Sequence, residues 1–186
     1  SGISGYSIIS AGSYSYLFLS LPWEEEDAIS DREWILNVLD THREYPTIVF
    51  SHFNEDMDTF VKPFDQVFMT VRGHIEERWV SVFKNNMGHD VIDVVTNYQF
   101  DLYGGNGWLS TMEFDEEANR IYFRCYSPWV EKKMKILSGE IENNGILLPG
   151  EMRLFLFDKL CNTVVATDNM VIEIDFKKRF TNSAQC

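Results

Sequence analysis

The sequence predicts an α+β fold in which β-strands dominate. Short runs of β-branched and aromatic residues, separated by turn-forming residues, recur along most of the 186 residues, and such runs are typical of strands. A helical period is clear over about residues 31–43. Strand patterns lie on both sides of that helix, an order that favours a crossover unit over an all-β domain.

The N-terminal part of the chain predicts a hairpin, a helix and a strand. Residues 6–9 and 13–21 are two apolar runs joined by a short turn, which predicts the hairpin. Ser30 or Asp31 can cap the helix. Four apolar residues share one face of it: Trp34, Ile35, Val38 and Leu39. A buried strand over residues 47–51 follows.

The remaining segments predict further strands. Residues 53–65 are polar and contain a proline, so a loop or a short helix is expected there. Strands are predicted over 66–72, 79–83 and 91–99. A hairpin is predicted from residues 108–114 and 120–126. Beyond about residue 135, four short alternating runs predict a small C-terminal antiparallel sheet: 136–141, 152–157, 163–167 and 170–176.

Composition limits the classes of function. The chain carries a net charge of −13, which argues against nucleic acid as a partner because phosphate contacts require clustered Lys and Arg. Its 14 Phe, 8 Tyr and 5 Trp indicate a real core rather than disorder. No apolar run approaches the roughly 20 residues of a membrane span, so no such span is expected.

The three cysteines match no zinc motif and are too few for a disulfide scaffold. Cys125 lies in a strand pattern and is expected to be buried. A disulfide between Cys125 and Cys161 stays open from the sequence, and Cys186 is the last residue.

Two of the four histidines follow apolar strands. His52 comes directly after the strand over 47–51, and His74 follows the strand over 66–72. Ligand sites in sheets gather at strand ends, where the backbone is rigid, so the two residues are candidate metal ligands. A lone histidine in such a place is more often a core or rim residue. His42, near the helix end, and His89, in a turn, fit structural and solvated roles.

Glu76 is the third candidate ligand, two residues after His74. Imidazole and carboxylate together suit Zn, Mn, Fe or a similar divalent ion. A dinuclear centre requires more ligands than these three, because two ions share a larger cage with a bridging carboxylate.

Several segments together resemble the calcineurin-like metallophosphoesterases over roughly residues 1–130. The strand ending in His52 resembles one ligand strand of that family, and Gly73-His74-Ile75-Glu76 resembles its Gly-His-x-His motif. Further segments in the same order are similar to a bacterial, often exported branch of the family: Asn97-Tyr98-Gln99, Gly104 to Trp108, Glu113-Phe114-Asp115 and Tyr126-Ser127-Pro128.

The resemblance implies the C-terminal half of a two-sheet sandwich with a flanking helix. It implies that His52 and His74 ligate one metal, while Glu76 stands where the family has its second histidine and would ligate the other. The family's earlier motifs, which supply the remaining ligands and the bridging aspartate, do not occur here. Residues 1–130 would then be half of the family's domain, and 131–186 a small β-rich subdomain.

The expected function is therefore phosphoester hydrolysis by a dinuclear metal centre. An N-terminal portion of the same protein, or a second copy, would complete the centre, and the isolated chain would be inactive or weak. Half a sandwich would expose a sheet edge and an apolar face, which also implies a partner.

Two other functions stay open. The first is a non-catalytic binding or structural module derived from that family, in which several tryptophans could form a carbohydrate or peptide platform. These are Trp23, Trp79, Trp108 and Trp129. The second is nucleophilic catalysis by Cys125 or a serine with a histidine, although no nucleophile-elbow motif supports it.

Overall fold

The computed structural model describes residues 4–22, 30–52, 57–74, 79–99, 105–146 and 169–180. They fall into two compact units. The first comprises Ser1–Asn97, Asp115–Arg120 and Glu173–Cys186, and the second comprises Tyr98–Phe114 and Ile121–Ile172. The domain boundary predicted after residue 130 stays a prediction. Strands in two sheets outnumber the helices, so the predicted β-dominant α+β class is confirmed for the described residues.

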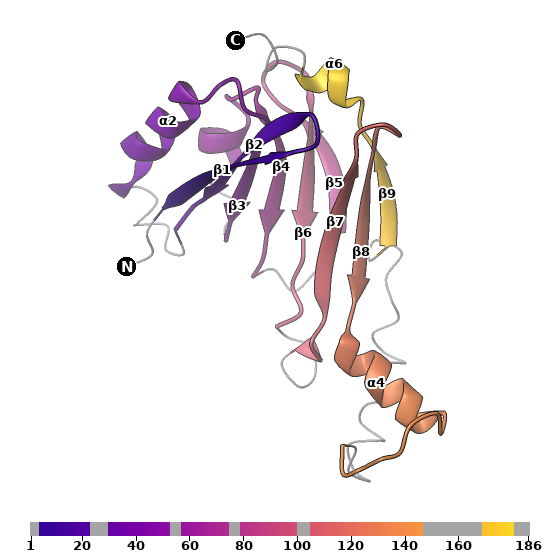
Figure 1. Cartoon of the computed structure of the whole chain (residues 1–186). Helices are drawn as coiled ribbons and strands as arrows, with labels where there is room; N and C mark the ends of the chain where they lie inside the picture. The colour runs from indigo at the N-terminus through magenta and orange to yellow at the C-terminus, as the bar shows by residue number, and fades with distance from the viewer. Residues whose placement is uncertain are drawn as a thin grey trace. The chain divides into compact units, whose positions relative to one another are not determined.

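A mixed six-stranded sheet of order β1-β2-β3-β4-β6-β5 forms the first unit. Its strands are β1 (Gly5–Ala11), β2 (Tyr14–Ser20), β3 (Thr47–Ser51), β4 (Val67–Arg72), β5 (Trp79–Lys84) and β6 (Asp90–Val95). Strands β2, β3, β4 and β6 run parallel, whereas β1 and β5 pair antiparallel with their neighbours. Figure 1 shows the arrows of β3, β4 and β6 pointing the same way.

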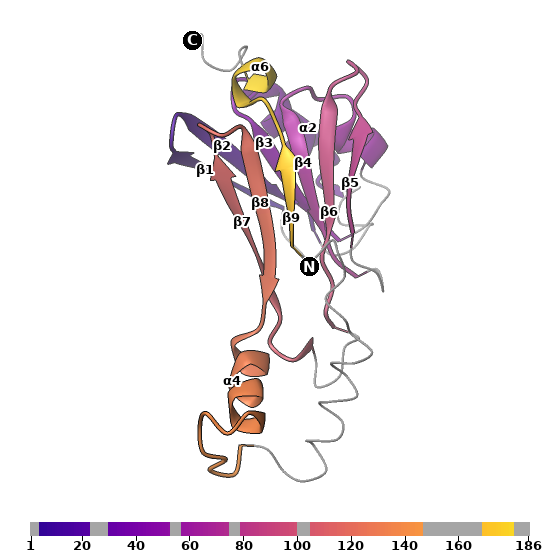
Figure 2. The ribbon, with the colours of Figure 1, turned by 90° about the vertical axis from the view of Figure 1, so that its right-hand side faces the viewer.

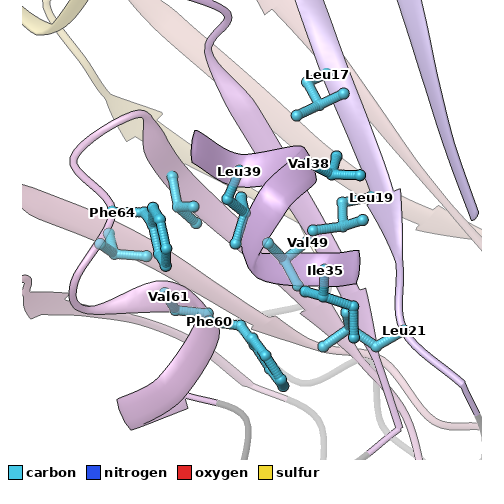
Figure 3. Close-up of a cluster of buried hydrophobic side chains, with 12 residues drawn as sticks. Leu17, Leu19, Leu21, Ile35, Val38, Leu39, Val49, Phe60, Val61 and Phe64 are labelled. Carbon is cyan, nitrogen blue, oxygen red and sulfur yellow. The ribbon is translucent and has the colours of Figure 1, made fainter. Parts of the chain in front are cut away.

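Helix α2 (Arg32–Thr41) makes the predicted crossover between β2 and β3. Its buried residues Ile35, Val38 and Leu39 lie on one helical face toward the sheet, whereas Trp34, predicted on the same face, is exposed. Figure 3 shows them against Leu17 and Val49 of the sheet, together with the segment around a single turn of π-helix, η1 (Met57–Val61). That turn stands where a loop or a short helix was predicted.

The C-terminal helix α6 (Phe176–Phe180) covers the opposite face of the same sheet, which Figure 2 presents with α6 on the near side. The Phe180 ring lies 4.9 Å from that of Phe68 and 5.3 Å from that of Tyr14. Arg179 donates to the carbonyls of Asp65 (2.7 Å) and Val67 (3.1 Å). These contacts attach the end of the chain to the sheet.

The second sheet has the order β7-β8-β9. The predicted hairpin is confirmed as β7 (Leu109–Asp115) and β8 (Arg120–Tyr126). The last predicted strand is β9 (Asn169–Glu173), which lies beside β8 in this sheet. The strands predicted over 152–157 and 163–167 lie outside the described residues.

The strand predicted over 136–141 is wrong, because helix α4 (Pro128–Leu137) occupies its first residues and a turn follows. The helix has a strong start signal. Ser127 accepts a hydrogen bond from the Val130 N–H, and Pro128 occupies the first turn, where a missing N–H costs nothing. The alternation of apolar residues near Ile136 suggested a strand, but Lys133 and Ile136 are buried at helical spacing.

Replacing Ser127 with alanine is expected to destabilise the second unit by about 1–2 kcal/mol. The Ser127 hydroxyl caps α4 through Val130 N (3.0 Å) and donates to the Asn106 carbonyl, and both bonds would be lost. Urea unfolding followed by circular dichroism measures the change. Ser138→Ala, at the exposed end of the same helix, should stay within about 0.5 kcal/mol of the wild type. Equal costs for the two variants would contradict the capping role.

Candidate metal centre

The carboxyl ends of three parallel strands align at one edge of the six-stranded sheet. Ser51 of β3 pairs with Arg72 of β4, and Arg72 pairs in turn with Val95 of β6. The Thr96 N–H donates to the Arg72 carbonyl at 3.0 Å, which continues the ladder by one residue. Since His52 follows Ser51 directly and His74 follows Arg72 by two residues, both histidines lie at this edge.

The rings of His52 and His74 lie together, with centroids 4.3 Å apart and planes tilted by 41°. Two imidazoles on one tetrahedral ion, with metal–nitrogen distances of about 2.0–2.1 Å, hold their ring centres about 5 Å apart. The observed spacing of 4.3 Å is shorter than this, so a shared ion would require the two rings to move slightly apart. His52 is half-buried and His74 is exposed, so solvent reaches the pair.

The backbone of His74 is strained. Its φ is +65°, in the left-handed region that residues with a Cβ avoid. Such conformations persist where the surrounding structure fixes them, and they cluster at functional sites. The strain at His74 thus supports a role for this residue beyond packing.

Two histidines alone do not complete a metal site. Glu76, the third candidate, lies outside the described residues, and no group of three or more His, Cys, Asp or Glu side chains gathers within them. The nearness of the two rings makes His52 and His74 candidate ligands of one ion. Any further ligands would come from Glu76 or from a partner.

A buried charged cluster lies next to this edge. The Asp93 Oδ1 accepts from Arg72 Nε (2.8 Å) and Thr70 Oγ1 (2.7 Å). The Asp93 Oδ2 accepts from Arg72 Nη2 (2.6 Å) and Trp79 Nε1 (3.3 Å). The Arg72 and Asp93 side chains are only 5% and 7% exposed. Burial alone raises the pKa of Asp93, but the bonds from Arg72 and Thr70 and the charge of Arg72 hold it below its usual range.

Sequence reasoning missed this cluster, although a signal was present. Thr70, Arg72 and Asp93 are polar residues inside strands that are otherwise apolar and buried. A polar residue in such a strand requires a buried partner. The partner could not be named, because β4 and β6 are adjacent only in the folded sheet.

The other two histidines have structural partners. His42 ends α2 as predicted, with Nδ1 2.8 Å from the Val38 carbonyl. His89 is exposed as predicted, but its Nδ1 lies 2.6 Å from Asp65 Oδ1. Asn85 Nδ2 donates to the same oxygen at 2.8 Å.

Acid should weaken the fold partly through Asp65. Burial alone raises the pKa of Asp65, but the hydrogen bonds from His89 and Asn85 and the charge of Arg179 hold it below its ordinary value of 3.8. Because the folded pKa is the lower one, this stabilisation is present above pH 3.8 and is lost as the pH falls through the folded pKa. Asp65→Asn should therefore lose less stability than the wild type between pH 5 and 2, measured by urea unfolding at each pH. An unchanged acid dependence would contradict this assignment.

The described tryptophans have separate surroundings. Trp79 donates to Asp93, Trp108 stacks on Tyr98 with centroids 6.2 Å apart, and Lys133 Nζ lies 4.9 Å from the Trp129 ring centroid. Trp23 lies outside the described residues. The aromatic platform stays a prediction.

Cys125 is buried in β8 as expected and carries a free thiol, with Sγ 3.1 Å from Ser110 Oγ. Cys161 and Cys186 lie outside the described residues. Nucleophilic catalysis by Cys125 therefore gains no support from its setting, because an inert structural thiol is buried in the same way.

The chain is similar to a distant bacterial protein. The uncharacterized protein YvnB of Bacillus subtilis (strain 168) is 25% identical to this chain over 146 residues. The match covers 69% of this chain and 11% of YvnB, so the chain spans about a tenth of the length of that relative. No protein-family model matches the chain. Across the described segments, no helix has the length and apolar character that crossing a membrane requires.

Proposed function

We propose that this chain is the C-terminal portion of a metal-dependent phosphoesterase of the calcineurin-like type. The observation that carries the proposal is the pairing of His52 and His74 at the ends of adjacent parallel strands, with ring centroids 4.3 Å apart. Two imidazoles brought together by separate strands can supply two ligands of a coordination sphere. The fold supports the same proposal, since a parallel sheet with a covering helix presents its strand ends as a site.

In this proposal His52 and His74 hold a divalent ion such as Zn, Mn or Fe, and Glu76 supplies a carboxylate. The metal, when bound, would lower the pKa of a water molecule and polarise a phosphoryl oxygen. The two imidazoles would bind in their neutral form, and the exposed face of His74 would leave the ion open to a phosphoester.

An N-terminal portion of the same protein, or a second copy, would supply the remaining ligands. The coverage of YvnB is compatible with a longer parent protein, since only 11% of that relative matches. The alternative is a non-catalytic binding module of the same origin. A chain that binds metal, but whose hydrolysis no upstream portion restores, would favour this binding module.

Metal stoichiometry tests the proposed ligands. Titration with Zn²⁺, followed by desalting and elemental analysis, should give about one ion per chain, since the chain offers one such pair of histidines for a single ion. His52→Ala should abolish this binding, whereas His89→Ala, which changes a histidine bound to Asp65, should leave it intact. Equal metal content in the two variants would contradict the proposal.

Activity tests the predicted incompleteness of the centre. The isolated chain, loaded with Zn²⁺ or Mn²⁺, should hydrolyse p-nitrophenyl phosphate weakly or not at all, because the ligand set is too small for two ions. Substantial metal-dependent turnover by this chain alone would show that no partner is required.

A further inference from the structure

Stability alone gives no reason for the charged pair behind the histidines. Burying two charges costs about as much as their attraction returns, and apolar residues of similar volume often serve as well. The pair is also imperfectly satisfied, because the buried Arg72 Nη1 has no hydrogen-bond partner among the described residues. A buried charged pair at this position therefore points to a requirement for a particular geometry.

Arg72 is the residue that links both histidines to the rest of the sheet. It pairs with Ser51, which precedes His52, and it precedes His74 by two residues. Its side chain binds Asp93 through two nitrogens, and its carbonyl accepts from the Thr96 N–H. One residue at the end of β4 is thus held from three sides.

The strain at His74 requires such a support. A left-handed backbone at a residue with a Cβ is maintained only where its neighbours fix the chain. A bidentate guanidinium–carboxylate pair fixes direction as well as distance, which a single hydrogen bond or an apolar contact does not.

We propose that the Arg72–Asp93 pair is a positioning device that fixes the end of β4 and so sets His74 against His52 for metal binding. This inference rests on the proposed metal site. Thr70 and Trp79 complete the device, because each donates to one oxygen of Asp93. Supporting residues of this kind typically change metal affinity by about 10- to 100-fold when they are replaced.

A double substitution separates positioning from stability. Arg72→Met with Asp93→Leu removes both charges together and keeps the volume, so no charge stays buried alone. The folded double variant should bind Zn²⁺ about 10- to 100-fold more weakly than the wild type by calorimetry. The visible spectrum of bound Co²⁺ should also change, since it reports the ligand geometry.

The matched control is Lys84→Met with Asp90→Leu, which removes an exposed ion pair (2.7 Å) from the far end of the neighbouring strands β5 and β6. It should keep the wild-type affinity and Co²⁺ spectrum. If the central double variant fails to fold, Thr70→Val gives the second test. It removes one donor to Asp93, so weaker Zn²⁺ binding is expected.

The outcomes distinguish the two proposals. Wild-type affinity and spectrum in the folded central variant, or in Thr70→Val, would overturn the positioning role and leave the metal site standing. Failure of the wild-type chain to bind Zn²⁺ would overturn both proposals.

Discussion

Replacing Asp93 with alanine is expected to lower the free energy of unfolding by about 3–5 kcal/mol. The substitution leaves the Arg72 guanidinium buried without its counter-charge, and it removes the acceptor for Thr70 and Trp79. Four donor atoms on three side chains in a low-dielectric site would then lack their acceptor, which is far costlier than losing an exposed ion pair. Urea or thermal unfolding of the whole chain measures the difference.

Asp90→Ala is the matched control, because it lies on the same strand and pairs with Lys84 at the surface, with side chains 59% and 63% exposed. It should cost no more than about 1 kcal/mol. The central double variant described above should regain most of the loss caused by Asp93→Ala. A cost for Asp93→Ala as small as that of the control would show that the buried charge is tolerated.

Replacing His74 with glycine is expected to remove metal binding and yet give a more stable fold than replacing it with alanine. Both variants lose the imidazole, so both lose half of the ligand pair, and affinity should fall by more than about 100-fold, beyond the effect of a supporting residue. The φ of +65° favours glycine, since alanine carries the Cβ that disfavours this region. The glycine variant should therefore exceed the alanine variant by about 1 kcal/mol in free energy of unfolding.

His89 provides the comparison for the backbone effect, because it lies outside the positive-φ residues. There, His89→Gly should be no more stable than His89→Ala, since glycine loses more conformational freedom on folding. Equal free energies of unfolding for His74→Ala and His74→Gly would mean that the left-handed backbone at residue 74 does not destabilise the fold. Retained metal binding in either variant would remove His74 from the ligand set.

Individual strands and helices could be predicted from the sequence wherever a single period of apolar residues dominated a segment. The hairpin over β1 and β2, helix α2 and the strands ending before His52 and His74 are confirmed to within two residues at their boundaries. Helix α4 was missed because Ile136 to Ile141 also fits a strand period, and short apolar runs satisfy both. The capping signal at Ser127-Pro128 predicts the start of the helix that the structure shows.

Only part of the candidate site could be predicted from the sequence. The two histidines were found because apolar β-branched runs end at each of them, and parallel strands deliver such ends to one edge. Glu76 was proposed as a third ligand and stays a prediction outside the described residues. The charged pair behind the site was not found.

The sequence by itself determined most strands of the first unit, which helix crosses over, and that His52 and His74 stand at strand ends. Only the tertiary structure decided the strand order, in which β5 turns back against β6 and leaves β6 beside β4. That order brings Arg72 of β4 next to Asp93 of β6, 21 positions further along the chain. Strand β5 lies between the two strands in the sequence but not in the sheet. The period of apolar residues in one segment indicates which of its side chains are buried. Which strand becomes its neighbour in the sheet depends on the free energy of the whole sheet.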